Sequence, residues 1–341
     1  MKKLLFIPLA LALLSSCEKI TSDATKQPVD PESGPKIHLS FVPEQPTVKT
    51  FFDPTATAEA WEKTLSSVDA LVFNAEGRLL VHRKFTASEL TSKSASFAVP
   101  NTAAGTACEF YVVANRPLSG LSTKAELLAL IQSDAADYNG TFAEVSTRAK
   151  RSGGFVMSGS ASKTLAAAGS ATDVAVTLRR CVAKIAVQTS LSAEFAARYS
   201  GKVRIATATL SRAASRSSLI GQATPTPGTM TFTHTQSAGS SGEKYNNLFY
   251  AFENGNLAAG SRVLLTLEGT YDRDGDFSTT ADQAPVSYRI ELTGGGAGQL
   301  LRNGYYRVQV TLDGLTGSDA TVRISVAEWE TPLTQTVSLG A

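Results

Sequence analysis

The sequence predicts an all-β protein with a few short helices, built from two antiparallel β-sandwich domains. A chain of 341 residues suits two domains of about 150 residues each. Hydrophobic residues make up 43% and charged residues 18% of the chain, a balance typical of a folded protein. Short apolar segments alternate with polar residues at a period of two, and Gly- or Pro-rich connections such as ATPTPG and TGGGAG separate them.

The first segment has the order of a bacterial export signal. Two lysines precede an apolar run at 4–14, which is shorter than the about 20 residues that cross a bilayer. Small residues then lead to Cys17 in LSSC, which resembles the lipobox of bacterial lipoproteins. The resemblance implies a signal peptide at 1–16 and a lipid anchor on the Cys17 thiol. The next residue is Glu18 and not Asp, which by the same resemblance favours the outer membrane.

The charge of the mature chain is balanced. When Lys2 and Lys3 are removed with the signal, 30 of the 32 basic residues remain, and they equal the 30 acidic residues in number. A surface without excess positive charge does not collect phosphates, so the composition excludes nucleic acid as a partner.

The first sandwich is expected at 36–189, after a flexible tether at 17–35 that holds three prolines and no apolar periodicity. It begins with KIHLSF, in which Ile37, Leu39 and Phe41 share one face because alternate residues of a strand point to the same side. Its other strands are expected at 68–73, 79–85, 96–99, 109–114, 155–158, 173–178 and 181–188.

Two short helices are expected within this unit. The first lies at about 53–65, where an Asp-Pro pair starts it and Trp61 faces the core. The second begins at Thr123, which has capping-box spacing to a glutamate, and it buries apolar residues as far as Ile131.

The second sandwich is expected at 190–341. Seven short strands with few helices favour an antiparallel sandwich here as well. These strands are expected at 203–210, 229–233, 248–253, 262–271, 286–292, 305–312 and 321–329.

No group of residues predicts an enzyme or a cofactor site. The three histidines are scattered without metal-ligand spacing, and neither a GxSxG elbow nor a phosphate-binding loop is present. In YDRDGDF, Asp272, Asp274 and Asp276 have the spacing of a calcium loop, but the glycine and the twelfth residue do not fit one. A polar hairpin tip is the alternative interpretation.

Two cysteines remain after the signal. Cys108 and Cys181 can form one disulfide in an exported protein. Both lie in apolar, strand-like runs, where a free cysteine behaves as a small buried hydrophobic residue. Both alternatives stay open, and a catalytic thiol is not predicted because neither cysteine has a neighbouring histidine.

Several strings resemble a known family. In order along the chain these are VDALVFNAEGRLL, FYVVANRP, GFVMSGS, LRRCVAKIAV, LFYAFEN, RNGYYRVQV and VRISVAEW. Together with the lipobox they resemble the fimbrillin family, the lipoprotein-derived subunits of type V pili, from about residue 37 onward. The resemblance implies two transthyretin-like sandwiches, a structural role in a cell-surface fimbria that serves adhesion, other fimbrial subunits as partners, and no catalytic activity or cofactor.

The resemblance also implies a mode of assembly. A trypsin-like protease removes the leading segment with the first strand, and a strand from the next subunit fills the vacated slot. Ile37, Leu39 and Phe41 are the candidate occupants of the slot. Within 330–341, Leu333, Val337 and Leu339 share one parity and are candidates for the donated strand. An ordinary terminal strand is the alternative for this segment.

One departure from the family concerns processing. The best-known members are cut after arginine, whereas here the first arginine is Arg78, inside the first hairpin. Lys49 lies just after the first strand and is the candidate cleavage site. Without a cut the lipid stays, and the chain would be a fimbrial anchor or a glycan-binding surface lipoprotein that does not polymerise. The ligand of adhesion is not predicted.

Overall fold

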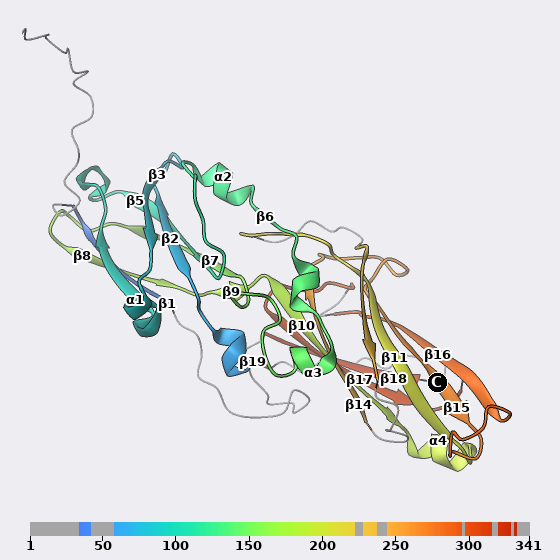
Figure 1. The fold of residues 1–341 in the computed structure, drawn as a ribbon. Coiled ribbons are helices and arrows are strands. Elements are labelled where there is room, and N and C mark those ends of the chain that lie inside the picture. Colours follow the sequence, from blue (N-terminus) through green and yellow to red (C-terminus); the bar gives the residue numbers. More distant parts are fainter. Residues whose placement is uncertain are drawn as a thin grey trace, which may run out of the picture.

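The computed structural model describes residues 34–41, 58–221, 228–236, 244–294, 297–315, 320–328 and 331–332. Several predictions lie outside these residues: the signal at 1–16, the tether up to residue 33, the lipidation site Cys17, the cleavage site Lys49 and the donor residues Leu333, Val337 and Leu339. Figure 1 shows an elongated molecule in which a blue-green N-terminal half is followed by a yellow-red C-terminal half.

The N-terminal half is a sandwich of a five-stranded and a three-stranded sheet, with orders β3-β2-β5-β7-β9 and β4-β1-β8. The five-stranded sheet contains β2 (Val68–Phe73), β3 (Leu79–Lys84), β5 (Ala107–Ala114), β7 (Met157–Thr164) and β9 (Arg179–Arg180). The three-stranded sheet contains β1 (Lys36–Phe41), β4 (Ser94–Ala98) and β8 (Ala171–Val176). The predicted hairpin is formed by β2 and β3.

The C-terminal half also has two sheets, with orders β14-β10-β17-β18-β19 and β13-β11-β15-β16. The first contains β10 (Val182–Leu191), β14 (Tyr245–Phe252), β17 (Gly304–Leu312), β18 (Ala320–Glu328) and β19 (Thr331–Pro332). The second contains β11 (Lys202–Ala213), β13 (Met230–Thr235), β15 (Leu264–Asp272) and β16 (Gln283–Glu291). The predicted all-β sandwich class is therefore confirmed.

Two strand pairs differ from the antiparallel expectation. β1 pairs with β8 in parallel, and β10 pairs with β17 in parallel. Parallel partners cannot be joined by a hairpin, so their pairing is set by strands distant in sequence. The strand that we expected to complete the first unit, at 181–188, is β10, and it pairs with β14 and β17 of the C-terminal half. Consecutive residues 182–187 of β10 are buried, so both faces of the strand are covered, which explains why this run is apolar except at Lys184.

Short helices cover the connections. They are η1 (Ala60–Lys63), α1 (Ala87–Ser92), η2 (Asn101–Ala103), α2 (Lys124–Leu128), η3 (Ala135–Tyr138), α3 (Phe142–Val145) and α4 (Ala193–Arg198). The predicted capping box at Thr123 is present at the start of α2. Ile131 was wrongly expected to be buried, because α2 ends before it and it lies on the two-residue strand β6 (Ile131–Gln132), 44% exposed. None of the helices in the described ranges is long and apolar enough to span a membrane.

Candidate functional site

The strand predicted as the slot occupant, β1, is the middle strand of its sheet. β4 pairs with it in antiparallel and β8 in parallel orientation. Leu39 stands opposite Ala95 on β4 and Val174 on β8. Residues directly opposite each other in a sheet contact one another on the same face, so the two neighbouring strands form the side walls of a slot that β1 fills.

The inner face of β1 is fully buried. Ile37 and Leu39 are 0% exposed and Phe41 is 2% exposed, which confirms that these three residues share a core-facing side. The ring of Phe41 lies 5.5 Å from that of Phe85, measured between centroids. On the outer face His38 is exposed, and its Nδ1 lies 3.0 Å from the hydroxyl of Ser96. This strand therefore belongs to the hydrophobic core and is not loosely attached.

The predicted acidic group lies at the tip of the hairpin between β15 and β16. Asp272 and Asp274 approach each other there, and the third carboxylate of the group belongs to Asp282 instead of Asp276. Asp272 is buried, and its carboxylate accepts hydrogen bonds from the backbone N–H of Gly275 (2.7 Å) and from the amide of Gln283 (2.9 Å). These bonds fix the turn, which agrees with the hairpin-tip alternative.

The two cysteines are free thiols. Cys108 on β5 and Cys181, between β9 and β10, are both buried. Burial raises the pKa of Cys181 to about 11. Since the thiolate is the reactive form of cysteine, both residues act as small core side chains in this structure.

A buried polar cluster, absent from the sequence predictions, joins the two halves. Glu62 on η1 and Lys184 on β10 are both 0% exposed, and the Lys184 Nζ lies 2.8 Å from the Glu62 Oε1. The hydroxyl of Tyr250 on β14 donates to the same carboxylate at 2.7 Å. Arg180 donates from its Nε to the backbone carbonyl of Glu62 and from its Nη1 to the side chain of Asn303. We call Glu62, Lys184, Arg180 and Tyr250 the junction cluster.

The two cations of the junction cluster stabilise the charged form of Glu62. Burial by itself raises the pKa of Glu62, but Lys184, Arg180 and the Tyr250 hydroxyl together hold it below its ordinary value. The carboxylate is therefore ionised at neutral pH. An ionised carboxylate without water is tolerated only when its oxygens are paired in this way.

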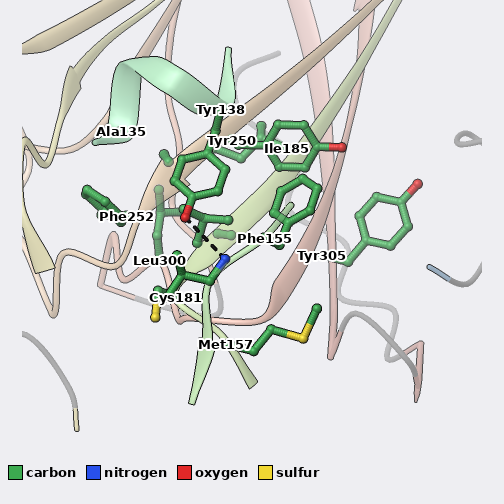
Figure 2. Close-up of a cluster of buried hydrophobic side chains, with 14 of the residues drawn as sticks. Ala135, Tyr138, Phe155, Met157, Cys181, Ile185, Tyr250, Phe252, Leu300 and Tyr305 are labelled. Carbon is green, nitrogen blue, oxygen red and sulfur yellow. Dashed lines mark hydrogen bonds between the residues drawn. The ribbon is translucent and has the colours of Figure 1, made fainter. Parts of the chain in front are cut away.

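Aromatic side chains surround the junction cluster. Figure 2 shows Tyr138 and Phe155 from the N-terminal half beside Tyr250 and Phe252 of the C-terminal half. The ring centroids of Phe155 and Tyr250 are 4.8 Å apart, and those of Tyr138 and Phe252 are 6.2 Å apart. Trp61 packs against Phe155 at 6.1 Å, so its predicted core-facing orientation is observed. The buried apolar residues of the two halves form one continuous core.

The edge of β14 is covered by the loop after η3. The side-chain amide of Asn139 donates to the backbone carbonyl of Tyr250 at 2.8 Å, and its Oδ1 accepts from the Tyr250 backbone N–H at 2.9 Å. The amide thus imitates a neighbouring strand. The backbone N–H and carbonyl of Tyr250 are thereby occupied and cannot pair with another chain at this position.

The burial of His234 on β13 is expected to make the folded protein less stable at acidic pH. Its ring stacks on Phe249 at 4.2 Å and is 2% exposed. Burial lowers its pKa from 6.5 to about 4, although the nearby Asn247 side chain and Gly140 backbone oppose the shift. The unfolded chain therefore binds a proton between these values while the folded chain does not. The contribution of His234 to the free energy of unfolding is therefore fully present above pH 6.5. It decreases as the pH falls toward 4, by at most about 3 kcal/mol.

The measurement is urea unfolding at several pH values. His234→Phe removes the titrating group, so we expect a flatter dependence of the free energy of unfolding between pH 6.5 and 4. The exposed His38→Gln serves as the control and keeps the wild-type dependence. An unchanged slope in His234→Phe would refute the assignment.

Comparison with known proteins agrees with this architecture. Residues 39–192 match the family model described as major fimbrial subunit protein (FimA). No curated protein sequence matches the chain.

Solved structures align over most of the chain. A candidate cell adhesion protein from Parabacteroides distasonis has a TM-score of 0.60 at 15% identity, with coverage of 89% of this chain and 100% of that one. A fimbrilin (FimA) from Porphyromonas gingivalis has a TM-score of 0.59 at 14% identity, covering 89% and 99%. The tip fimbrial protein Mfa3 of the same organism, with a C-terminal truncation, has a TM-score of 0.54 at 16% identity, covering 86% and 100%.

The fold of this chain is similar to that of these solved structures. Identities this low establish the fold, and the family match covers 154 of the 341 residues. Residues 39–192 match the model of the major fimbrial subunit family, in agreement with the resemblance to fimbrillins.

Proposed function

We propose that this chain is a fimbrial subunit, that it polymerises by strand exchange, and that it serves adhesion at the cell surface. In the exported precursor β1 occupies the slot between β4 and β8, and in the fimbria a strand of the next subunit replaces it. The observation that carries the proposal is the burial of Ile37, Leu39 and Phe41, which leaves an apolar slot with unpaired backbone groups whenever β1 is removed. The role requires no catalytic step by this chain.

We propose processing at Lys49, between β1 and β2. Lys36 is an alternative lysine for cleavage. Proteases bind accessible, unpaired chain, whereas the backbone of Lys36 is held in a sheet. It is the first residue of β1, and its backbone N–H donates to the carbonyl of Ser170 at 3.0 Å. A cut after Lys36 would also leave the rest of β1 attached to the subunit. A cut after Lys49 separates the whole strand.

The partners follow from the same mechanism. Other fimbrial subunits, either copies of this chain or minor subunits, donate the strand, and in this chain the candidate donor residues are Leu333, Val337 and Leu339. Their spacing places them on one side of an extended strand, as the slot requires. The lipid on Cys17 attaches the precursor to the outer membrane before processing.

The test is identification of the mature N-terminus by mass spectrometry of fimbriae sheared from cells. We expect the N-terminal peptide to begin at Thr50 in the polymer. A lipid-modified Cys17 as the only N-terminus would contradict processing and would assign the chain as a membrane anchor. Lys49→Gln is the matched variant, and it should accumulate the precursor and reduce the number of fimbriae.

A further inference from the structure

The three-stranded sheet depends on β1 for its strand pairing. Its order is β4-β1-β8, so β4 and β8 are separated by β1 and do not pair with each other. Among the described residues, β1 is the sole strand paired with either of them. Removal of β1 therefore breaks every strand pair of this sheet, and the two remaining strands do not form a smaller one.

β8 illustrates this dependence. All its residues from Ala171 to Val176 pair with Lys36 to Phe41 of β1. Val174 and Val176 point into the core, and Val174 lies opposite Leu39. Without β1 the backbone of β8 loses its pairing partner, and Val174 loses its neighbour Leu39. Unpaired backbone groups and exposed apolar surface are both unfavourable in water.

Within the described residues, every position of the slot that faces β1 is already paired with it. Every residue of β4 from Ser94 to Ala98 has a partner on β1. The contacts continue past both ends, since Val99 donates from its backbone N–H to the carbonyl of Pro35 and Phe41 donates to that of Lys93, each at 3.1 Å. A new strand can therefore pair only where β1 has first separated locally.

We propose that β1 stays in the slot after the chain is cut and leaves only when the incoming strand displaces it. The cut makes β1 exchangeable but does not empty the slot, so a subunit with a vacant slot does not accumulate. This inference rests on the proposed strand exchange, but it concerns the cut subunit before it meets a partner. It can therefore be tested without any assembly.

The test uses the chain from Glu18 onward, with a recognition sequence for a specific protease placed between residues 45 and 50. After complete cutting, the protein is passed through size-exclusion chromatography and examined by native mass spectrometry. We expect the β1 fragment to remain bound and the backbone amides of β8 to keep their protection from hydrogen exchange. Release of the fragment with β8 still protected would overturn the proposal, because it would demonstrate a stable vacant slot. Release with loss of protection would overturn it equally.

Leu39→Ala is the weakening variant, and Ser40→Ala on the outer face is its matched control. Truncation of a fully buried leucine should speed loss of the cut fragment by about thirtyfold or more. Protection of β8 should disappear at the same rate as the fragment. Fragment loss from Leu39→Ala that leaves β8 protected would refute the dependence of β8 on β1.

A second experiment tests this inference independently of the proposed function. A labelled peptide with the sequence of β1 is added in excess to the cut protein. We expect bound fragment to be released in proportion to peptide uptake, whereas release without uptake contradicts displacement. If the fragment is retained but cells form no fimbria from this subunit, the proposed function is refuted. The inference that β1 stays bound after the cut remains valid in that case.

Discussion

Replacement of Glu62 by leucine is expected to lower the free energy of unfolding by about 3–5 kcal/mol. The variant leaves Lys184 fully buried without its carboxylate partner. Lys184 must then either lose its proton or remain as an uncompensated charge in the core, and both are costly. Because Glu62 belongs to the N-terminal half and Lys184 to a C-terminal sheet, we expect the junction between the halves to loosen first. Urea unfolding measures the total loss.

The double variant Glu62→Leu with Lys184→Met tests whether the loss comes from the unpaired charge. It removes both charges and keeps apolar volume, so most of the stability should return. Arg180 keeps its bonds in this variant, because it donates to the Glu62 backbone carbonyl and to Asn303. Hydrogen exchange at η1 and β10 would report whether the junction closes again.

The control is Glu109→Gln. Glu109 forms an ion pair with Lys124 at 2.7 Å, but both side chains are about one-third exposed. Exposed pairs contribute between about 0 and 1 kcal/mol, so the expected change is small. Equal losses in Glu62→Leu and Glu109→Gln would show that burial of the junction cluster does not matter.

The strands and the inner face of β1 could be predicted because their causes are local. A period of two in KIHLSF determines which residues share a side, whatever the strand pairs with. The capping box at Thr123 is likewise a contact between residues three apart. Such features depend on backbone geometry over a few residues, and the sequence contains all of it.

Pairing partners could not be predicted, because they depend on residues far apart in the chain. The apolar pattern of 181–188 indicates a buried strand. It does not show whether this strand pairs with β14 and β17 or with a strand of the N-terminal half. The spacing of three aspartates predicted Asp276 as the third carboxylate, whereas the hairpin brings Asp282 to that position from its opposite arm. The spacing of residues within 272–276 does not predict that Asp282, just before β16, lies close to them.

The junction cluster left one signal in the sequence. Lys184 interrupts the apolar run CVAKIAV, and a lysine inside a buried strand requires a partner. The sequence does not identify that partner, because Glu62 is 122 residues away, and several other acidic residues precede the strand. Only the fold brings these two side chains together.

The combined variant Ile37→Asp and Phe41→Asp is expected to prevent stable folding of the N-terminal half of the precursor. Both side chains lie in the core, at 0% and 2% exposure. Loss of each large apolar side chain costs about 2–5 kcal/mol, and burial of a carboxylate adds a further penalty. The sum approaches the total stability of a typical domain, about 5–15 kcal/mol. Circular dichroism, proteolysis and fimbria counts on cells would measure the outcome.

The matched control carries the same change of charge on the other face of the same strand. His38→Asp with Ser40→Asp also adds two carboxylates, but His38 is exposed and Ser40 is partly exposed. Repulsion between the new residue 38 and Asp173, its neighbour on β8, costs less than about 1 kcal/mol. Since the two variants differ only by one step along the strand, a difference between them isolates the core-facing side of β1. Folding and assembly by both variants alike would mean that β1 is not the segment that completes the sandwich, and strand exchange at this slot would have to be abandoned.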